Sequence, residues 1–488
     1  MNENKGRYSY LFSNMALFTI SNFVSKILVF LLVPFYTTYL SESEYGVADL
    51  MQTTLLLTVP ILTVNIGESA LRFALEGDDK NNIFDIGLRY VLKGIAIVGG
   101  LVFTAVCVGT FTGFLNDGLL KIYLIIFFVL YAADAFYEFM LLFSQGCDAV
   151  KIMICGSVSC TVLVIASNLI ALLVLRTGLY GYLTAQVISF AGAGFLIYIL
   201  MKREGYIGNA SLDRKNEGYR ALKGQMVSYG KGMQLYAASS WANNAIDRYF
   251  ILFFLGSAVN GLYGVAYKIP AILTTFQRIF AQAFQMSAVK EYEGDDPENF
   301  FSTLYRIYNA VMVFGCAALV YILKPLAAFL FREGFFEAWV LVPPLLISII
   351  FGALEGFLGS ICLAYKDGRS MGRATGTGAV VNIVLNYILI GPFGAMGAAV
   401  ATAISYFVML VMAYIMVRKH IVLKTGFVKN LFCYALLGAE SVVLITGIRY
   451  YYLYNALIIL ALCALYFKDF KEVYKKLMEK RSAKAEGK

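Results

Sequence analysis

The sequence predicts an all-α integral membrane protein with about 14 transmembrane helices, arranged as two parallel six-helix repeats followed by a C-terminal helix pair. Three observations carry this prediction. The 488 residues are 60% hydrophobic and only 15% charged, with a mean hydropathy of +0.71. Apolar runs long enough to cross a bilayer recur along the whole chain. Basic loops alternate between these runs, and the chain contains a long internal repeat.

Hydropathy places the spans in order along the chain. They are expected near residues 11–40, 46–75, 84–112, 119–144, 150–175, 181–201, 225–255, 262–288, 304–331, 338–364, 373–392, 395–417, 429–447 and 450–467. Lys and Arg gather in every second loop, and basic loops stay on the cytoplasmic side of a membrane. Both termini are therefore expected in the cytoplasm, which an even number of spans also requires.

An internal repeat relates the two halves of the chain. Tyr45–Ala48 returns as Tyr263–Ala266, and Glu76–Asp79 returns as Glu293–Asp296. These anchors recur in one order, which indicates two structurally related halves, an architecture from which many secondary transporters are built. Further anchors at the same spacing of 216 to 218 residues are Asn168 with Asn386, Gly178 with Gly394, and Ser189 with Ser405.

The repeat sets the expected domain boundaries. Residues 1–203 form the first six-helix repeat, 204–224 a polar cytoplasmic linker, and 225–418 the second repeat. Because six is even, both halves enter the membrane in the same direction, so an axis along the membrane normal should relate them. Helices 13 and 14, at 429–467, have no counterpart in the repeat. The tail at 468–488 is basic and amphipathic, and we expect it on the anionic cytoplasmic leaflet.

Three short segments carry the pattern of a known family. They are Tyr39–Gly46 at the end of the first span, Asp247-Arg248 ahead of Tyr263-Gly264, and Asn382–Ala403 with its Gly-x-x-Gly-Ala-Ala motif. The pattern resembles that of the Wzx-type polysaccharide flippases, which belong to the multidrug/oligosaccharidyl-lipid/polysaccharide exporter superfamily. The resemblance covers residues 10–467. It implies an alternating-access flippase that moves an undecaprenyl-pyrophosphate-linked oligosaccharide to the outer leaflet of a bacterial cytoplasmic membrane, for cell-surface polysaccharide synthesis.

The resemblance also names partners: the lipid-linked oligosaccharide, membrane lipids, H⁺ or Na⁺ as the coupling ion, and a polysaccharide polymerase. Two other classes of protein compete with the flippase. A cation-coupled multidrug exporter of the same superfamily would need an acidic or apolar cavity with an acid in the first span, whereas the first span here holds Lys26 and no acid. A membrane enzyme, such as a polymerase or glycosyltransferase, conflicts with the two-half repeat and with the short outer loops.

Further classes of function are excluded by what the sequence lacks. There is no Gly-x-x-x-x-Gly-Lys-Ser/Thr loop, so the chain should not hydrolyse ATP. The single histidine, His420, and eight cysteines without metal-type spacing give no metal site. The net charge of +9 is divided among loops rather than gathered in one patch, which argues against nucleic acid as a partner. We expect no enzymatic activity, cofactor or metal.

Lys26 and Arg278 are the two cations expected at the centre of the membrane. Lys26 lies about 22 Å of helix from the start of the first span, too far for its side chain to reach either interface. Arg278 lies in span eight beside Gln277 and close to Gln282, and its fixed fork of donors suits a pyrophosphate. We expect both to bind substrate. The alternatives are an ion pair of Lys26 with an acid such as Asp134, and a polar clamp between helices at Arg278.

Asn382 and Asn386 share one face of span eleven. Their amides can bond sugar hydroxyls, or they can join helices to one another, and the sequence leaves both roles open. The remaining candidates are cations that lie nearer the interfaces, where snorkelling or a local pair, such as Glu68 with Arg72, is the alternative. These substrate-binding candidates are Arg248, Lys268 and Arg72.

Asp134 and Glu138 lie one helical turn apart near the middle of span four, and Glu355 lies in span ten, the equivalent helix of the second half. Two carboxylates on one face of a buried helix repel each other when both are charged, so one of them can hold a proton or a cation during a transport cycle. We therefore predict a coupling site at these residues. The alternative is that they balance the charges of Lys26 and Arg278.

Overall fold

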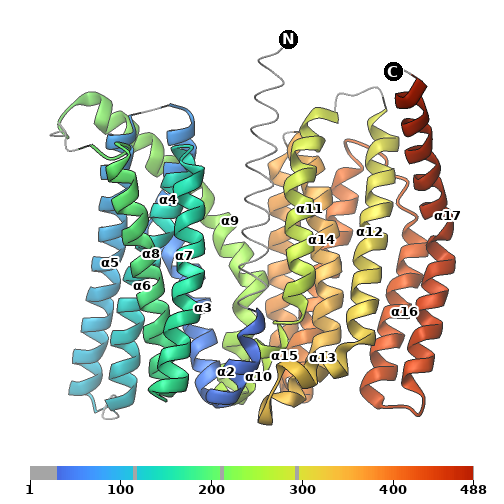
Figure 1. The fold of residues 1–488 in the computed structure, drawn as a ribbon, viewed down its shortest axis with the longest axis horizontal. Coiled ribbons are helices and arrows are strands. Elements are labelled where there is room, and N and C mark those ends of the chain that lie inside the picture. Colours follow the sequence, from blue (N-terminus) through green and yellow to red (C-terminus); the bar gives the residue numbers. More distant parts are fainter. Residues whose placement is uncertain are drawn as a thin grey trace. The chain divides into compact units, whose positions relative to one another are not determined.

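The computed structural model of the protein describes residues 30–77, 79–113, 118–208, 214–291, 296–365 and 367–486. Within these ranges the regular elements are helices and none is a strand, so the predicted all-α fold class is confirmed. The chain divides into two compact units, Met1–Trp241 and Ala242–Lys488. Figure 1 shows each unit as a bundle of long helices.

In the first unit, α6 is the central helix, because it packs against α4, α5 and α8, while α7 packs against α8 and α6. The described elements of this unit are α2 (Val33–Tyr39), α3 (Glu42–Leu62), α4 (Ile66–Leu75), α5 (Lys80–Phe111), α6 (Gly118–Gly146), α7 (Val150–Asn168), the π-helix η1 (Leu169–Val174), α8 (Gly178–Arg203) and the first part of α9 (Glu217–Leu255).

The predicted span at 46–75 is two helices rather than one. A capping box starts α3: Ser41 N donates to Glu44 Oε2 at 2.8 Å, and Glu44 N donates to Ser41 Oγ at 3.3 Å. The helix ends at Leu62, and Val64 and Asn65 adopt left-handed backbone angles, with φ of 59° and 49°. Such angles break the helical ladder, and α4 begins at Ile66.

In the second unit, α14 is the central helix, packed against α11, α12, α15 and α16. Its elements after α9 are α10 (Ser257–Ala266), α11 (Pro270–Glu291), α12 (Pro297–Tyr321), α13 (Leu323–Leu330), the 3₁₀ helix η2 (Glu333–Leu341), α14 (Val342–Ala364), α15 (Gly368–Val417), α16 (Phe427–Thr446) and α17 (Tyr451–Glu486). The span predicted at 262–288 is also broken, by the turn between α10 and α11.

The long element α15 contains two of the predicted spans, 373–392 and 395–417. They meet at Gly394, whose φ of 60° and ψ of −146° lie outside the helical region. Glycine adopts these angles without a steric penalty, and Pro392 precedes it in the same helix. Hydrogen bonds between Asn382 and Ser405 join the two arms. The element is therefore a helical hairpin with almost no connecting loop.

The chain is a multi-pass membrane protein. Among the described residues, nine helices are long and apolar enough to cross a membrane: α3, α5, α6, α7 with η1, α8, α12, η2 with α14, α15 and α16. The segment Tyr451–Phe467 of α17 is a shorter apolar helix. The predicted number, about fourteen, is larger because α15 holds two spans, because the first predicted span lies mostly outside the described residues, and because α9 and α11 are more polar.

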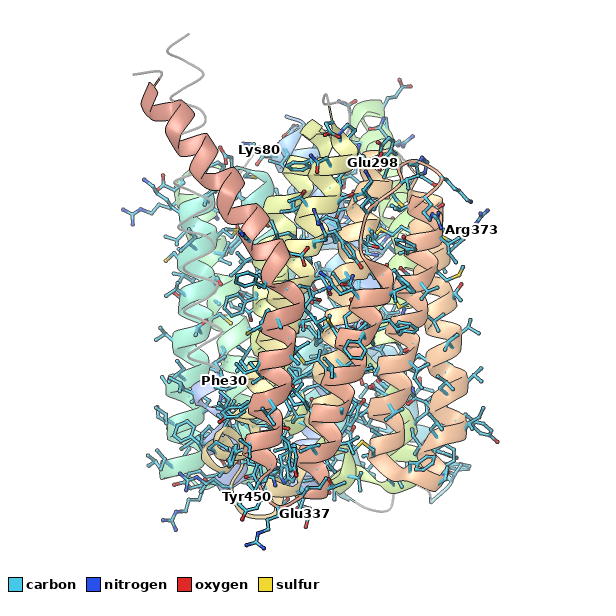
Figure 2. All side chains as sticks on the ribbon, turned by 90° about the vertical axis from the view of Figure 1, so that its right-hand side faces the viewer. Phe30, Lys80, Glu298, Glu337, Arg373 and Tyr450 are labelled. Carbon is cyan, nitrogen blue, oxygen red and sulfur yellow. The ribbon has the colours of Figure 1, made fainter. Side chains whose placement is uncertain are left out.

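The loops of the second unit lie at two opposite ends. Figure 2 shows Glu298 and Arg373 at one end of this unit and Glu337 and Tyr450 at the other. The prediction assigned the first two to cytoplasmic loops and the last two to outer loops, and the structure places the two pairs at opposite ends, while the end that faces the cytoplasm stays a prediction. Helix α9 begins at Glu217, inside the predicted linker, and α17 continues as helix through the predicted tail. The boundaries of the six-helix repeats stay a prediction.

Candidate functional site

The second unit holds a buried network of polar side chains around Asp247, which is only 1% exposed. Its Oδ2 accepts hydrogen bonds from the hydroxyls of Tyr263, Tyr267 (3.3 Å) and Thr402 (3.4 Å). Its Oδ1 accepts from the backbone N–H of Arg248 at 3.0 Å and pairs with Nη1 of the same residue at 3.4 Å. Protein groups alone thus satisfy this carboxylate, as burial requires.

Arg248 is buried together with its acidic neighbour. Its Nη1 also donates to the carbonyl of Asn244 at 2.9 Å, and its guanidinium lies 4.6 Å from the ring centre of Tyr267. A guanidinium engaged with a carboxylate, a carbonyl and an aromatic face has few donors left for a substrate. These contacts favour the local-pair alternative for Arg248 over substrate binding.

Asn382 and Asn386 extend the network along the α15 hairpin, and both are buried. Asn382 Nδ2 donates to Ser405 Oγ at 3.2 Å and to Thr402 Oγ1 at 3.5 Å, and Asn386 Nδ2 donates to Asn382 Oδ1 at 2.9 Å. The two amides therefore join the arms of the hairpin. Thr402 and Ser405, which complete the network, have no distinguishing local pattern, although Ser405 is an anchor of the internal repeat.

The first unit contains three carboxylates that contrast with Asp247. Glu68, Asp134 and Glu138 form no ion pair or hydrogen bond with another residue that the structure describes. Glu68 and Asp134 are half-buried, and Glu138 is exposed. Glu138 lies within electrostatic reach of the other two. In the second unit, Glu355 is buried in α14, and its Oε1 has no hydrogen-bond partner among the described residues.

The cations predicted to bind substrate lie in different environments. Arg278 is exposed on α11 and forms no ion pair with another described residue. Lys268 is half-buried in the turn between α10 and α11. Lys26 lies outside the described residues. The Arg278 guanidinium is thus neither buried nor ion-paired within the described part of its own unit.

Arg72 pairs with a different acid from the one predicted. Its Nε lies 3.1 Å from Oε1 of Glu76, rather than near Glu68, and its guanidinium lies 4.8 Å from the ring centre of Tyr229. Both acids are four residues from Arg72, so the sequence could not separate them. Glu68 instead lines a cavity at the start of α4. The Arg72 side chain is 54% exposed.

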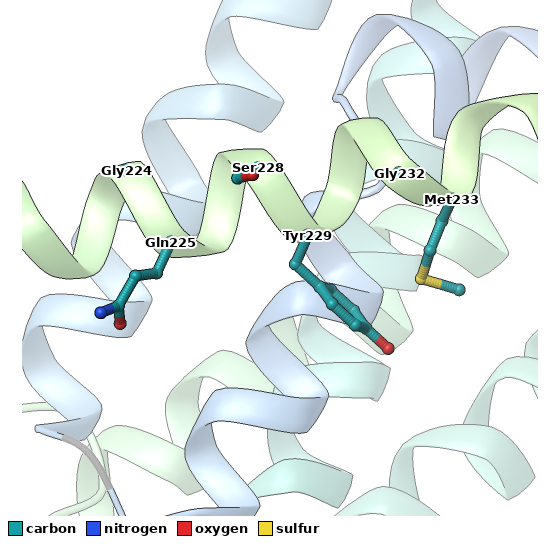
Figure 3. Close-up of a pocket in the computed structure, with 6 residues that line it drawn as sticks. All are labelled: Gly224, Gln225, Ser228, Tyr229, Gly232 and Met233. Carbon is teal, nitrogen blue, oxygen red and sulfur yellow. The ribbon is translucent and has the colours of Figure 1, made fainter. Parts of the chain in front are cut away.

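A wide, open hollow of about 610 Å³ lies along one face of α9 in the first unit. Figure 3 shows its lining residues, all from this helix: Gly224, Gln225, Ser228, Tyr229, Gly232 and Met233. The amide, the hydroxyls and the aromatic ring are groups that bond or stack against sugars and other polar ligands. Because the Arg72 guanidinium lies against the ring of Tyr229, the hollow lies beside this cation.

Outside the spans, the single histidine contacts an acid. His420 Nε2 lies 3.0 Å from Asp367 Oδ2, and the His420 ring stacks on Tyr365. Hydrogen bonds with Ser370 and then with His420 lower the pKa of Asp367 to about 2. Within the part of the chain that the structure describes, no group of three or more His, Cys, Asp and Glu could hold a metal ion.

Comparison with known proteins adds a family to this geometry. The family model described as "Polysaccharide biosynthesis protein" matches residues 11–289, which is more than half of the chain. The chain belongs to the polysaccharide biosynthesis protein family. The predicted resemblance to polysaccharide-exporting membrane proteins is confirmed at this level.

One relative of this family member is an uncharacterized membrane protein of Methanocaldococcus jannaschii, with 24% identity over 267 residues. The match covers 52% of this chain and spans 62% of the length of that relative. The name of the relative states no activity, so this match carries no substrate with it.

Solved structures share the fold of this polysaccharide biosynthesis family member. Lipid II flippase MurJ, in an inward closed conformation, has a TM-score of 0.66 at 13% identity, over 95% of this chain and 100% of that chain. An inward-facing MATE family multidrug resistance transporter of the MOP superfamily has the same TM-score and identity, over 81% and 94%. Another MOP superfamily transporter, from Pyrococcus furiosus, has a TM-score of 0.51 at 15% identity, over 83% and 92%. At such identities the likeness establishes the fold.

Proposed function

We propose that this protein is an alternating-access flippase that moves a polyprenyl-pyrophosphate-linked oligosaccharide across the cytoplasmic membrane of a bacterium, for cell-surface polysaccharide synthesis. Membership of the polysaccharide biosynthesis family and the fold shared with a lipid II flippase support this function. In the proposed cycle, the repeats at 1–203 and 225–418 rock around the substrate while both termini stay in the cytoplasm. A polysaccharide polymerase would receive the product.

The observation that carries the proposal is the exposed, unpaired cation on a membrane helix of the second unit. The Arg278 guanidinium has no ion-pair partner among the described residues, although its helix, α11, lies in a predicted membrane span. Keeping such a cation costs about 2.5–3.5 kcal/mol in a membrane span, which is recovered when an anionic ligand binds it. A pyrophosphate matches the fixed donors of a guanidinium. Lys26 is proposed as the second cation.

The open hollow on α9 has a mostly apolar surface that includes three polar side chains, and we propose that it binds the glycan part of the same substrate. Gln225, Ser228 and Tyr229 offer an amide and two hydroxyls along an open surface rather than in a closed pocket. An open surface can follow a long oligosaccharide, because no side chain must fit one sugar at a time. Arg72, which lies against Tyr229, is proposed to contact the headgroup, and Lys268, Asn382 and Asn386 stay weaker candidates.

Translocation of a fluorescent polyprenyl-pyrophosphate oligosaccharide in proteoliposomes tests the proposal. We expect wild-type transfer and a loss of at least about tenfold in Arg278→Ala and Lys26→Ala, which corresponds to about 1.4 kcal/mol in transition-state stabilisation. Arg449→Ala is the matched control, because Arg449 is exposed in the loop between α16 and α17 and lies over Tyr450. Full transfer by both test variants at normal protein levels would remove these residues from the site.

A cation-coupled multidrug exporter is the second candidate, and one observation favours it. In the first unit, Glu68, Asp134 and Glu138 have no ion-pair or hydrogen-bond partner among the described residues, and acidic groups of this kind bind cationic drugs. The MATE transporter has the same TM-score as the flippase. Efflux of a cationic dye such as ethidium, without transfer of the glycolipid, would decide for the exporter.

Coupling of transport to an ion is also proposed. Asp134, Glu138 and Glu355 lie in membrane helices without a described ion-pair partner, so each can hold H⁺ or Na⁺. Imposing a pH gradient or a Na⁺ gradient separately across the proteoliposome membrane identifies the ion. Transfer that ignores both gradients would exclude coupling.

A further inference from the structure

The break between α3 and α4 is held in an unfavourable backbone conformation. Val64 and Asn65 both have left-handed angles, which cost about 1–3 kcal/mol each for residues other than glycine and are least favourable for a β-branched side chain such as valine. Such angles persist only where the surrounding structure imposes them, and they cluster at functional sites. The break is therefore a place to look for a ligand.

A small cavity of about 20 Å³ lies at this break. That volume accommodates one water-sized particle and nothing larger. The polar side chains in its lining come from three segments: Thr63 and Asn65 from the break, Glu68 from α4 and Glu138 from α6. The remaining lining residues include Val59, Val91 and Leu142, which keep the rest of the wall apolar.

The polar groups around the cavity are incompletely bonded. Asn65 is 7% exposed, and its Nδ2 has no hydrogen-bond acceptor among the described residues. Glu68 and Glu138 have no described partner either. A buried amide donor without an acceptor costs about 1–3 kcal/mol, so a bound ligand that accepts from Asn65 would recover this energy. A ligand oxygen that also donates to two carboxylates satisfies all three residues.

We infer that this cavity is a proton-binding site, in which Glu68 and Glu138 share one proton through a water molecule held by Asn65. The buried Asn65 atom without a described partner, Nδ2, is an N–H donor, which binds a water oxygen. Two neighbouring carboxylates hold one proton between them, because both cannot stay charged at close range. On proton uptake, an O–H bond of a hydronium ion breaks and an O–H bond forms on one carboxylate. On release, that bond breaks and the proton returns to water.

The ionisable groups around the site are nearly all acidic. Helix α6 adds Asp134 and the buried hydroxyl of Tyr131 near Glu138. Helix α4 adds Arg72 one turn beyond Glu68, but this cation is paired with Glu76. Helix α5 contributes Val91 to the cavity, and α3 contributes Val59 and Pro60, none of which is ionisable. No cation among the described lining residues competes with a proton.

Helix α9 packs directly on the break, so protonation of the site can affect the position of this helix. Ser69 Oγ donates to the carbonyl of Met226 at 2.9 Å, and Gln234 Nε2 donates to the carbonyl of Ile61 at 2.9 Å. A Cβ at Gly230 would lie 2.0 Å from the carbonyl oxygen of Val64. The same helix continues in sequence into the second unit. A role in coupling therefore rests on the proposed transport function, whereas proton binding itself does not.

Infrared difference spectroscopy of the reconstituted protein tests proton binding without substrate. On acidification we expect a protonated-carboxyl C=O band that disappears in both Glu68→Gln and Glu138→Gln. Glu204→Gln is the matched control, because Glu204 is an exposed acid at the end of α8, and it should keep the band. A band unchanged in both test variants, or a band displaced by Na⁺ at constant pH, would overturn the proposal.

Carbodiimide labelling of the wild-type protein keeps the proposal testable if a variant fails to fold. The reagent modifies protonated carboxyls in apolar surroundings, so we expect label on Glu68 or Glu138 at low pH and less at high pH. Peptide mass spectrometry locates the label. Label confined to other acids would contradict the site.

Glycolipid transfer under an imposed pH gradient separates this inference from the proposed function. We expect transfer by the wild type to depend on the gradient and transfer by Glu138→Gln to lose that dependence. If the infrared band is present but no glycolipid moves, the proton site stands and the proposed function fails. If both variants lose the band but their transfer still depends on the gradient, proton binding and the function stand, and the role of this site in coupling fails. If the wild type moves glycolipid but the band persists in both variants, the function stands and the proton site fails.

Discussion

Two acidic sites, one in each unit, are bonded in opposite ways. In the second unit, Asp247 is buried and accepts hydrogen bonds from hydroxyls and an N–H group, in addition to its ion pair with Arg248. In the first unit, Glu68 and Glu138 surround a cavity and have no described partner. A carboxylate saturated with donors holds helices in place, whereas one without donors can change its charge. The second unit thus holds a saturated carboxylate at Asp247, and the first unit holds two carboxylates without described partners, at which we propose proton binding.

The largest loss of stability should come from removing the Asp247 carboxylate. Asp247→Ala leaves the Arg248 guanidinium buried without its carboxylate, which should cost about 3–5 kcal/mol of the free energy of unfolding. Denaturant titration in detergent, followed by helical circular dichroism, measures this loss. Asp247→Asn should cost less, because the amide oxygen still accepts from the tyrosine hydroxyls. Glu138→Gln should change the free energy of unfolding by about 0.5 kcal/mol or less. An equal loss for Asp247→Ala and Glu138→Gln would contradict the difference between the two sites.

Close packing of glycine offers a second comparison between the units. Gly230→Ala should destabilise the protein by about 1–3 kcal/mol, because its Cβ would meet the backbone oxygen of Val64, which cannot move without disturbing the break. Gly232→Ala on the same helix meets nothing within 4 Å and should be neutral or stabilising. In the second unit, Gly378→Ala meets the flexible side chain of Met409 and should cost less than Gly230→Ala. Thermal unfolding of the three variants gives the order.

Buried asparagines, one in each unit, sharpen the comparison further. Asn382 Nδ2 donates to side chains on the other arm of the hairpin, so Asn382→Ala should cost about 1–2 kcal/mol. Asn168 donates only to the carbonyl of Val164 on its own helix, so Asn168→Ala should cost about 0.5 kcal/mol. Unfolding midpoints in denaturant would measure both. A larger loss at Asn168 would show that the first unit is bonded as firmly as the second.

The smallest effect concerns pH outside the spans. The pKa of Asp367 falls from 3.8 to about 2 on folding, so its bonds with Ser370 and His420 stabilise the protein above about pH 4. This contribution is lost as the pH falls from 4 through 2. Asp367→Asn should therefore flatten the decline of the melting temperature over that interval. An unchanged decline would assign acid sensitivity to other carboxylates.

Hydropathy predicted the helical fold class and most of the long apolar helices, because a helix that crosses lipid must be apolar along most of its length. The break at Thr63–Asn65 escaped prediction, since no glycine or proline occupies the left-handed positions and Val64 favours extended structure. The i,i+4 rule found that Arg72 would pair within its helix, but two acids satisfy that spacing and only the folded helix end selects Glu76.

The site was partly accessible from sequence. Arg278, Asp134 and Glu138 could be predicted as site residues from the sequence, because each is a charged residue within an apolar run. The network around Asp247 could not be derived, because Thr402 lies 155 residues away and only tertiary packing brings the two together. The position of Asn65 beside a cavity depends on the backbone angles of the break, which the sequence does not predict.

The hairpin at Gly394 has a consequence for how the surface of this protein can be reached. A Cβ at Gly397 would lie 2.1 Å from the carbonyl of Leu389, so the two arms approach each other closely up to their junction. With no spare chain between them, a protease has no extended segment to cleave, and an epitope tag inserted there would have to separate the arms. Topology mapping should instead use the loop between α16 and α17, where Arg449 and Tyr450 are exposed.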